Sequence, residues 1–211
     1  MEVVGLVINL DSRLDRWNQI QETFKNIKSI KLERVSAVNN PENPRDGCIR
    51  SHQKAIQIAK ERNYLFALVI EDDCLIQQSE NFDQRFTDIL SWLNSNEWKI
   101  FNGGPTFIRP EKLRVIQNSP PIFELFNCGY AAHFIMYNSS VYEDMLNYYT
   151  PETKFKLEDH TLDIFIVKKF NQICTYPILA SQKESYSDIM KTYVNYNNVF
   201  VISNLILSRF L

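Results

Sequence analysis

Three consecutive acidic residues, Glu71, Asp72 and Asp73, directly follow a continuous apolar run at 64–70. Carboxylates that end a buried strand can converge on a hard divalent cation, because Mg²⁺ and Mn²⁺ prefer oxygen ligands, and such a cation can bridge a diphosphate. Side chains alternate between the faces of a strand, so we expect Asp73 as the principal metal ligand with Glu71 assisting, and Asp72 on the other side. The alternative is a solvated turn or helix cap, but three acids at a buried edge are electrostatically costly without a cation.

A second acidic segment, 157–163, contains Asp159, His160 and Asp163. Asp159 and Asp163 are one helical turn apart, so both can face the same cleft if a helix begins near here. A carboxylate in this position can act as a general base toward a hydroxyl group, and we expect Asp159 in this role with Asp163 as the alternative. His160 is a candidate for completing the metal shell. The competing interpretation is an acidic first turn that complements the helix dipole.

The elements that position these residues alternate between strands and helices. The apolar, β-branched run 3–10 predicts a buried strand, and apolar residues at three- and four-residue steps over 14–27 predict an amphipathic helix with Asp11 or Ser12 as its N-cap. Similar patterns predict strands at 31–38, 64–70, 98–101 and 128–137, helices at 48–62, 82–93 and 140–149, and a loop at 39–47.

This alternation favours an α/β fold in which a mainly parallel mixed central sheet is flanked by helices on both faces. In such sheets ligands bind beyond the carboxyl ends of the strands, so Asp11 and the acids at 71–73 should face one cleft. A length of 211 residues with 45% hydrophobic residues is enough for one compact domain, which we expect to cover 1–211.

Composition excludes several environments and partners. The formal net charge is −2 with acids and bases interspersed, so no basic field is available for a nucleic-acid backbone. Cys48, Cys74, Cys128 and Cys174 lie far apart, which predicts reduced thiols of a cytoplasmic protein. The N-terminus lacks the features of a signal peptide. The apolar run 199–207 is shorter than the roughly 20 residues of a membrane span, so we expect a packed terminal element and no transmembrane segment.

Three ordered motifs resemble one family of enzymes. The motifs are VINLDSRLDR at 7–16, GCIRSH at 47–52 and LVIEDD at 68–73, and together they look like glycosyltransferase family 25, which includes lipopolysaccharide-biosynthesis and procollagen galactosyltransferases. The resemblance implies a GT-A fold, a nucleotide-sugar donor with UDP as the expected nucleotide, Mn²⁺ or Mg²⁺, and transfer with inversion to a glycan or glycoprotein hydroxyl. It also implies a place in the bacterial cytoplasm, or in the host-cell cytoplasm for a viral enzyme.

Carried over by position, the resemblance implies a nucleotide site on the first motif. Asn9, Asp11, Arg13 and Arg16 match that motif, and the two arginines can donate paired hydrogen bonds to phosphate or to the base. The alternative for Arg16 is an exposed helix start where it pairs with Asp15.

The second motif and two glycines complete the implied donor site. Ser51 and His52 match the second motif and are implied to open a helix whose N-terminal amides face the diphosphate, with a structural histidine as the alternative. Asp72 is expected near the ribose or sugar. Gly103 and Gly104 can let the backbone approach the donor sugar, and a plain turn is the equal alternative.

Other hypotheses stay open from the sequence. One is a glycan-binding module that keeps the fold without turnover. Another is a metal-dependent hydrolase of nucleotide sugars that uses the same acids, although the chain lacks the supporting lysine or glycine-rich loop of many phosphate sites. Cys48 and His52 at helical spacing suggest a thiol nucleophile, but no orienting acid is evident. His133, in an apolar segment, is expected to be a core histidine.

Overall fold

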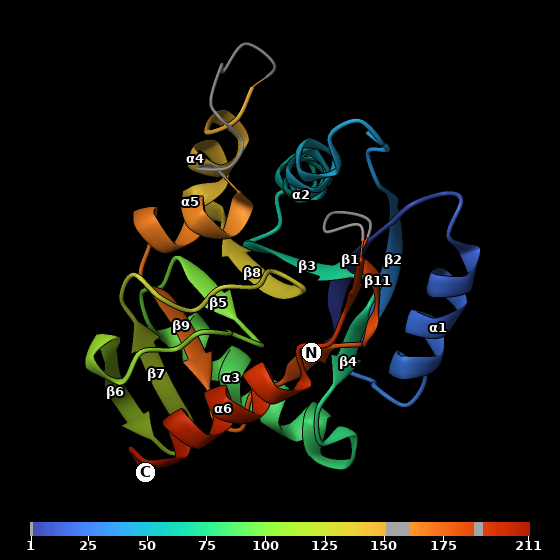
Figure 1. The fold of residues 1–211 in the computed structure, drawn as a ribbon. Coiled ribbons are helices and arrows are strands. Elements are labelled where there is room, and N and C mark those ends of the chain that lie inside the picture. Colours follow the sequence, from blue (N-terminus) through green and yellow to red (C-terminus); the bar gives the residue numbers. More distant parts are fainter. Residues whose placement is uncertain (1, 151–160, 188–191) are drawn as a thin grey trace.

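The computed structural model describes residues 2–150, 161–187 and 192–211, and its centre is a mixed eight-stranded sheet in the order β2-β1-β3-β8-β5-β9-β7-β6 (Figure 1). The sheet consists of β1 (Val3–Asn9), β2 (Ile30–Ser36), β3 (Phe66–Glu71), β5 (Ile100–Asn102), β6 (Leu113–Asn118), β7 (Pro121–Leu125), β8 (Phe134–Asn138) and β9 (Gln172–Thr175). Two short sheets pair β4 (Cys74–Ile76) with β10 (Ala180–Gln182) and β11 (Ser185–Ser187) with β12 (Thr192–Val194).

The expectation of a mainly parallel sheet is wrong. Within the described residues β1–β2, β1–β3 and β5–β9 pair in parallel, whereas β3–β8, β5–β8, β7–β9 and β6–β7 are antiparallel. The parallel part is the first three strands, which the helical crossovers at the start of the chain connect, and the opposite direction of β8 interrupts it. β6 and β7 form a hairpin that the sequence patterns do not predict. Half-buried and exposed side chains alternate along β6, as is typical of a sheet edge.

Helices cover both faces of this sheet. The described residues form α1 (Leu14–Phe24), α2 (Pro44–Glu61), α3 (Phe82–Ser95), α4 (Tyr142–Asn147), α5 (Leu162–Lys169) and α6 (Asn197–Ser208). α1 and α3 pack on one face, and α2, α4 and α5 pack on the other (Figure 1). α6 contacts a third apolar cluster around β7 and β9 through Phe200 and Leu207. The expected α/β fold with flanking helices is therefore confirmed.

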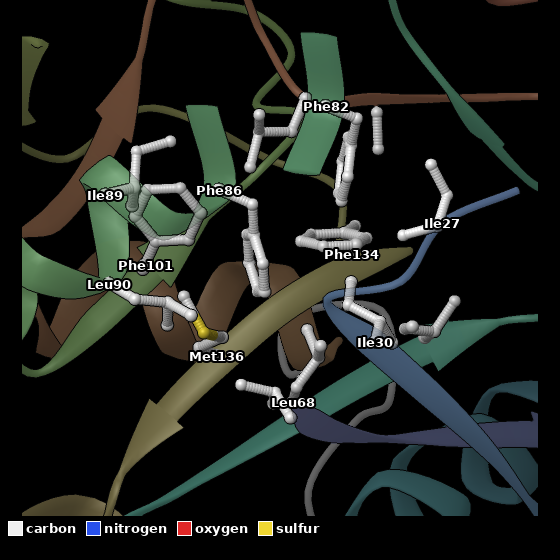
Figure 2. Packing of buried hydrophobic residues seen from close by; sticks show 14 of the residues in the cluster. Ile27, Ile30, Leu68, Phe82, Phe86, Ile89, Leu90, Phe101, Phe134 and Met136 are labelled. Atoms are coloured by element: carbon white, nitrogen blue, oxygen red, sulfur yellow. The ribbon is translucent and has the colours of Figure 1, made fainter. Parts of the chain in front are cut away.

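Aromatic side chains fix α3 to the middle of the sheet. Phe82 and Phe86 of α3 stack with ring centroids 5.5 Å apart, and both meet the ring of Phe134 in β8 edge-on, at 6.2 and 6.1 Å. Figure 2 shows the three rings grouped over β8, with Met136 of the same strand beside them. Burying such rings contributes several kcal/mol of stabilisation, on the order of 2–3 kcal/mol for each fully buried side chain. This layer holds β8 firmly against β3, whose last residue is the first acid of the 71–73 segment.

Two helix starts differ from the sequence-based prediction. α2 begins at Pro44, inside the segment predicted as a loop, because the Asn43 side chain accepts a hydrogen bond from the Asp46 N–H at 3.2 Å and proline suits the first helical position. The N-cap residue of α1 is Arg13, without a side-chain cap, so the assignment of Asp11 or Ser12 is wrong.

The remaining expectations concern the cysteines and the C-terminal run. All four cysteines lie in the described part of the chain and are free thiols. None of the described helices combines the length and the apolar character that a membrane span needs. The apolar C-terminal run forms a packed element, α6, although Val201, Ile202 and Leu205 on its outer side are exposed.

Candidate functional site

A cavity of about 740 Å³ opens where β1 and β3 end. The two strands are parallel, with Ile8 paired to Glu71, so the residues that follow them reach the same edge of the sheet. Residues from all three sequence motifs and from α5 line this cleft, among them Arg13, Arg16, Gly47, Cys48, Ser51, Glu71, Asp72, Asp73 and Asp163. Of the expectation that Asp11 and the acids at 71–73 face one cleft, the part on Glu71, Asp72 and Asp73 is therefore confirmed and the part on Asp11 is wrong.

Carboxylates, most of them half-buried, line one wall of the cleft. Burial, together with the charge of Asp72, raises the pKa of Glu71 to about 7. Burial and the charges of Glu71 and Asp72 likewise raise the pKa of Asp73 to about 7, and burial and Glu71 raise that of Asp163 to about 6. Oδ1 of Asp73 is buried and has no hydrogen-bond partner among the described residues. Ionised carboxylates are destabilised where burial and neighbouring negative charges raise their pKa values. A bound cation would stabilise their ionised form.

Asp72 differs from its two neighbours because both of its oxygens are engaged. Nδ2 of Asn9 donates to Oδ2 at 2.7 Å, and Nη1 of Arg16 donates to Oδ1 at 3.1 Å. Arg34 in turn donates to Oδ1 of Asn9 at 2.8 Å. Asp72 therefore holds Arg16 at the cleft instead of offering a free carboxylate. Asp15, the alternative partner of Arg16, accepts a hydrogen bond from Nε of Arg13 at 3.0 Å.

Ser51 and His52 lie well inside α2, so the expectation that they open a helix is wrong. Oγ of Ser51 donates to the Gly47 carbonyl at 2.6 Å and accepts from the Val38 N–H at 2.8 Å. His52 is fully buried, with Nδ1 3.0 Å from the hydroxyl of Tyr137 and Nε2 3.3 Å from Oε1 of Glu71. Burial lowers the pKa of His52 to about 4, so its imidazole is neutral at pH 7.

Five predicted donor-site residues lie outside the lining of the cleft: Asn9, Asp11, His52, Gly103 and Gly104. Asp11 is largely exposed and is held by the hydroxyl of Ser36 at 2.6 Å and by Arg34 at 3.2 Å. Gly103 and Gly104 are buried in the bend that follows β5. A Cβ atom on Gly103 would lie 2.4 Å from the ring of Phe134, and one on Gly104 would lie 2.3 Å from a backbone carbonyl oxygen. Close packing against protein atoms therefore accounts for both glycines.

Of the second acidic segment, 157–163, the structure describes only residues 161–163. Asp159 and His160 lie outside the described residues, so their assignments stay predictions. Asp163 is in the first turn of α5, whose N-cap Thr161 accepts a hydrogen bond from the Ile164 N–H at 3.4 Å. Asp163 lines the same cleft as the acids at the end of β3.

Sequence reasoning missed two residues of the site. Gln182 of β10 lines the cleft, and its Nε2 donates to Oε2 of Glu71 at 3.4 Å because β10 pairs with β4 immediately after the acids. Tyr137 of β8 contacts His52 from inside the core. The sequence assigns neither residue a role in the site, since β10 has only three residues and Tyr137 is one apolar-strand residue among several.

Comparisons with known proteins show the fold and no more. No protein-family model matches the chain, and no curated protein matches it. Among solved structures, the crystal structure of A197 from STIV is similar, with a TM-score of 0.52 and 12% sequence identity over 92% of this chain and 93% of that chain. At this identity the likeness shows that the two chains share an α/β architecture over nearly their whole lengths.

Proposed function

We propose that this protein is a metal-dependent glycosyltransferase of the GT-A type that moves a sugar from a nucleotide diphosphate, with UDP expected, to a hydroxyl of a glycan or glycoprotein. The observation that carries the proposal is that half-buried carboxylates and arginines line the same cleft. Burial raises the pKa values of Glu71, Asp73 and Asp163, which a cation would lower again. Arg13 and Arg16, paired with Asp15 and Asp72, lie on the same cleft. The cation of a metal-bound diphosphate would meet the carboxylates, and its phosphate oxygens would meet the arginines.

The residues present fit a hard cation. Asp73 offers a buried oxygen that accepts no hydrogen bond from the described part of the chain, and Glu71 lies beside it on the same wall. When bound, Mn²⁺ or Mg²⁺ would offset the charge that develops on the departing nucleoside diphosphate. His160 is kept as a further candidate ligand from the sequence.

Other side chains of the cleft bind the diphosphate and accept the proton of the acceptor. Arg16 is held by Asp72, which also accepts a hydrogen bond from Asn9. Arg16 and Arg13 bind the diphosphate through charge-assisted hydrogen bonds. Asp163 accepts the proton of the acceptor hydroxyl, since a carboxyl group with a pKa of about 6 is mostly ionised at pH 7 and is a stronger base than an ordinary aspartate. Asp159 remains the alternative base. Inversion at the anomeric carbon rests on the family resemblance.

Isothermal titration with UDP and with UDP- and GDP-sugars tests the proposal. We expect Mn²⁺-dependent binding that EDTA abolishes and that Asp73→Asn weakens at least about tenfold, because a charged ligand to the cation is lost. Glu97→Gln, the same chemical change at an exposed position, is the control. Absence of nucleotide binding in folded protein would favour the glycan-binding module. Release of phosphate-containing product without an acceptor would favour the hydrolase.

A further inference from the structure

A thiol, an imidazole and a carboxylate meet at the back of the cleft. One ligand atom from each of Cys48, His52 and Glu71 lies within 4.8 Å of the other two. Cys48 and His52 are four residues apart on α2, so their side chains lie one above the other on the same face of the helix. Glu71 is the last residue of β3, against which α2 packs. Two rigid elements thus bring the three groups together.

We propose that Cys48, His52 and Glu71 form a binding site for a borderline-soft divalent cation such as Zn²⁺. Thiolate and imidazole ligands favour Zn²⁺, whereas Mn²⁺ and Mg²⁺ favour carboxylate and phosphate oxygens. The sulfur, nitrogen and oxygen ligands of this site therefore differ from the all-oxygen ligands proposed around Asp73. Glu71 is adjacent to both proposed metal sites. This inference does not rest on the transferase activity.

The separations suit a tetrahedral ion. With metal–ligand distances of about 2.0–2.3 Å, neighbouring ligand atoms of a tetrahedral zinc site lie about 3.3–3.6 Å apart. Nε2 of His52 and Oε1 of Glu71 are already 3.3 Å apart. The sulfur of the half-buried Cys48 lies at most 4.8 Å from the other two ligand atoms, so it has to approach them by only about 1–1.5 Å, which one side-chain rotation can supply.

A second contact orients the imidazole for such a site. Metal-binding histidines commonly use their other ring nitrogen to donate a hydrogen bond, which fixes the ring and its tautomer. Nδ1 of His52 lies 3.0 Å from the hydroxyl oxygen of Tyr137, and both residues are fully buried. With the proton on Nδ1, the lone pair of Nε2 points toward Glu71 and Cys48. The hydroxyl of Tyr137 can also donate a hydrogen bond to Nδ1. The same contact is therefore compatible with the tautomer that carries its proton on Nε2, which would be the form without a metal.

Three protein ligands leave the fourth position open. Cys48 and Glu71 line the cleft, whereas His52 lies behind them. The open position therefore faces the cavity and not the core, as in zinc sites that keep one exchangeable ligand. The thiol hypothesis from the sequence is replaced by this one, because Cys48 is explained as a metal ligand without an attacking role.

Cobalt titration of the metal-stripped full chain tests the site without nucleotide or sugar. Co²⁺ bound to a thiolate gives a near-ultraviolet charge-transfer band, and we expect this band to saturate and to disappear when Zn²⁺ is added. Cys48→Ser should abolish the band. Cys128→Ala, which removes a buried thiol outside the cleft, should keep it, as should Asp73→Asn. Tyr137→Phe should weaken Co²⁺ binding about 10- to 100-fold, the usual effect of removing such a supporting contact.

A measurement on the unaltered protein guards against a variant that fails to fold. Zn²⁺ should slow alkylation of Cys48 by iodoacetamide at least about tenfold, as located by mass spectrometry, because a metal-bound thiolate is blocked. A folded wild-type chain without the cobalt band, a band that survives Cys48→Ser, or unchanged alkylation would each overturn the proposal. Mn²⁺-dependent nucleotide binding is a separate titration, so failure of one site is distinguishable from failure of the other.

Discussion

Replacing Asp73 by asparagine should stabilise the metal-free protein at alkaline pH. Burial, followed by the charges of Glu71 and Asp72, raises the pKa of this carboxyl from 3.8 to about 7. A group with a raised pKa in the folded state holds a proton that the unfolded chain releases, so it lowers stability progressively as the pH rises from about 4 to about 7. Asparagine keeps the shape of the side chain and carries no charge. The advantage of Asp73→Asn should therefore grow across that pH window.

The size of the effect follows from the pKa difference. The interval from 3.8 to about 7 corresponds to about 4 kcal/mol for a fully desolvated group. Asp73 is half-buried, and solvent screening halves the expected gain to about 2 kcal/mol at pH 8. For a chain of this length, that gain raises the unfolding midpoint by about 4–8 °C. At pH 5 less than half of this gain in unfolding free energy is expected, because pH 5 lies within the window in which the carboxyl titrates.

Thermal unfolding in EDTA at pH 5 and pH 8 measures the effect, with Glu97→Gln as the control for loss of an exposed carboxylate. Added Mn²⁺ should reverse the order at pH 8, because the ion stabilises the wild-type chain and has lost a ligand in the variant. An Asp73→Asn protein that is less stable than wild type in EDTA at pH 8 would refute the reasoning. So would a difference between the two proteins that is the same at both pH values.

Three further predictions follow from individual contacts. Arg16→Gln should weaken UDP binding in calorimetry about tenfold or more, whereas the exposed Arg62→Gln should not, because Arg16 lines the cleft. His133→Leu should flatten the acid side of the stability profile in urea unfolding. Burial lowers the pKa of His133 to about 4, so the wild type loses up to about 3 kcal/mol as the pH falls from 6.5 to 4, and equal pH slopes would contradict this. Gly104→Ala should cost about 1–3 kcal/mol of unfolding free energy by overpacking, and weaker donor binding at unchanged stability would instead favour a ligand contact.

The first half of the fold is predictable because its apolar patterns are long and regular. β1, β3, α1 and α3 each contain an uninterrupted apolar run or a clear helical period, and each appears where the sequence places it. The direction of a strand has no such signal. β8 is as apolar as a parallel strand but runs antiparallel between β3 and β5. Its direction depends on long-range connections, which an alternation of strands and helices does not reveal.

Residue type alone also leaves the reason for a glycine or a histidine undetermined. Gly103 and Gly104 follow a strand end, where a glycine can serve an approaching ligand or an approaching side chain. The structure shows the second case, with Phe134 and the backbone at Ala180 in the space that a Cβ would need. The predicted loop at 39–47 and helix at 48–62 place His52 near a helix start. Asn43 and Pro44 instead start α2 earlier, which moves His52 from the helix end into the core.

The contrast between Asp72 and Asp73 shows what the sequence can and cannot say about a run of acids. Strand alternation separates Asp72 from Glu71 and Asp73, and the contacts agree: Asp72 accepts from Asn9 and Arg16, while Asp73 has a buried oxygen without a partner among the described residues. The hydrogen bonds to Asp72 come from the first motif, 56 and 63 residues away along the chain. Neither motif alone therefore predicts which acid is neutralised by protein and which one needs an ion. Only the parallel pairing of β1 with β3 brings the two motifs together, so the division of roles among the acids is a property of the fold.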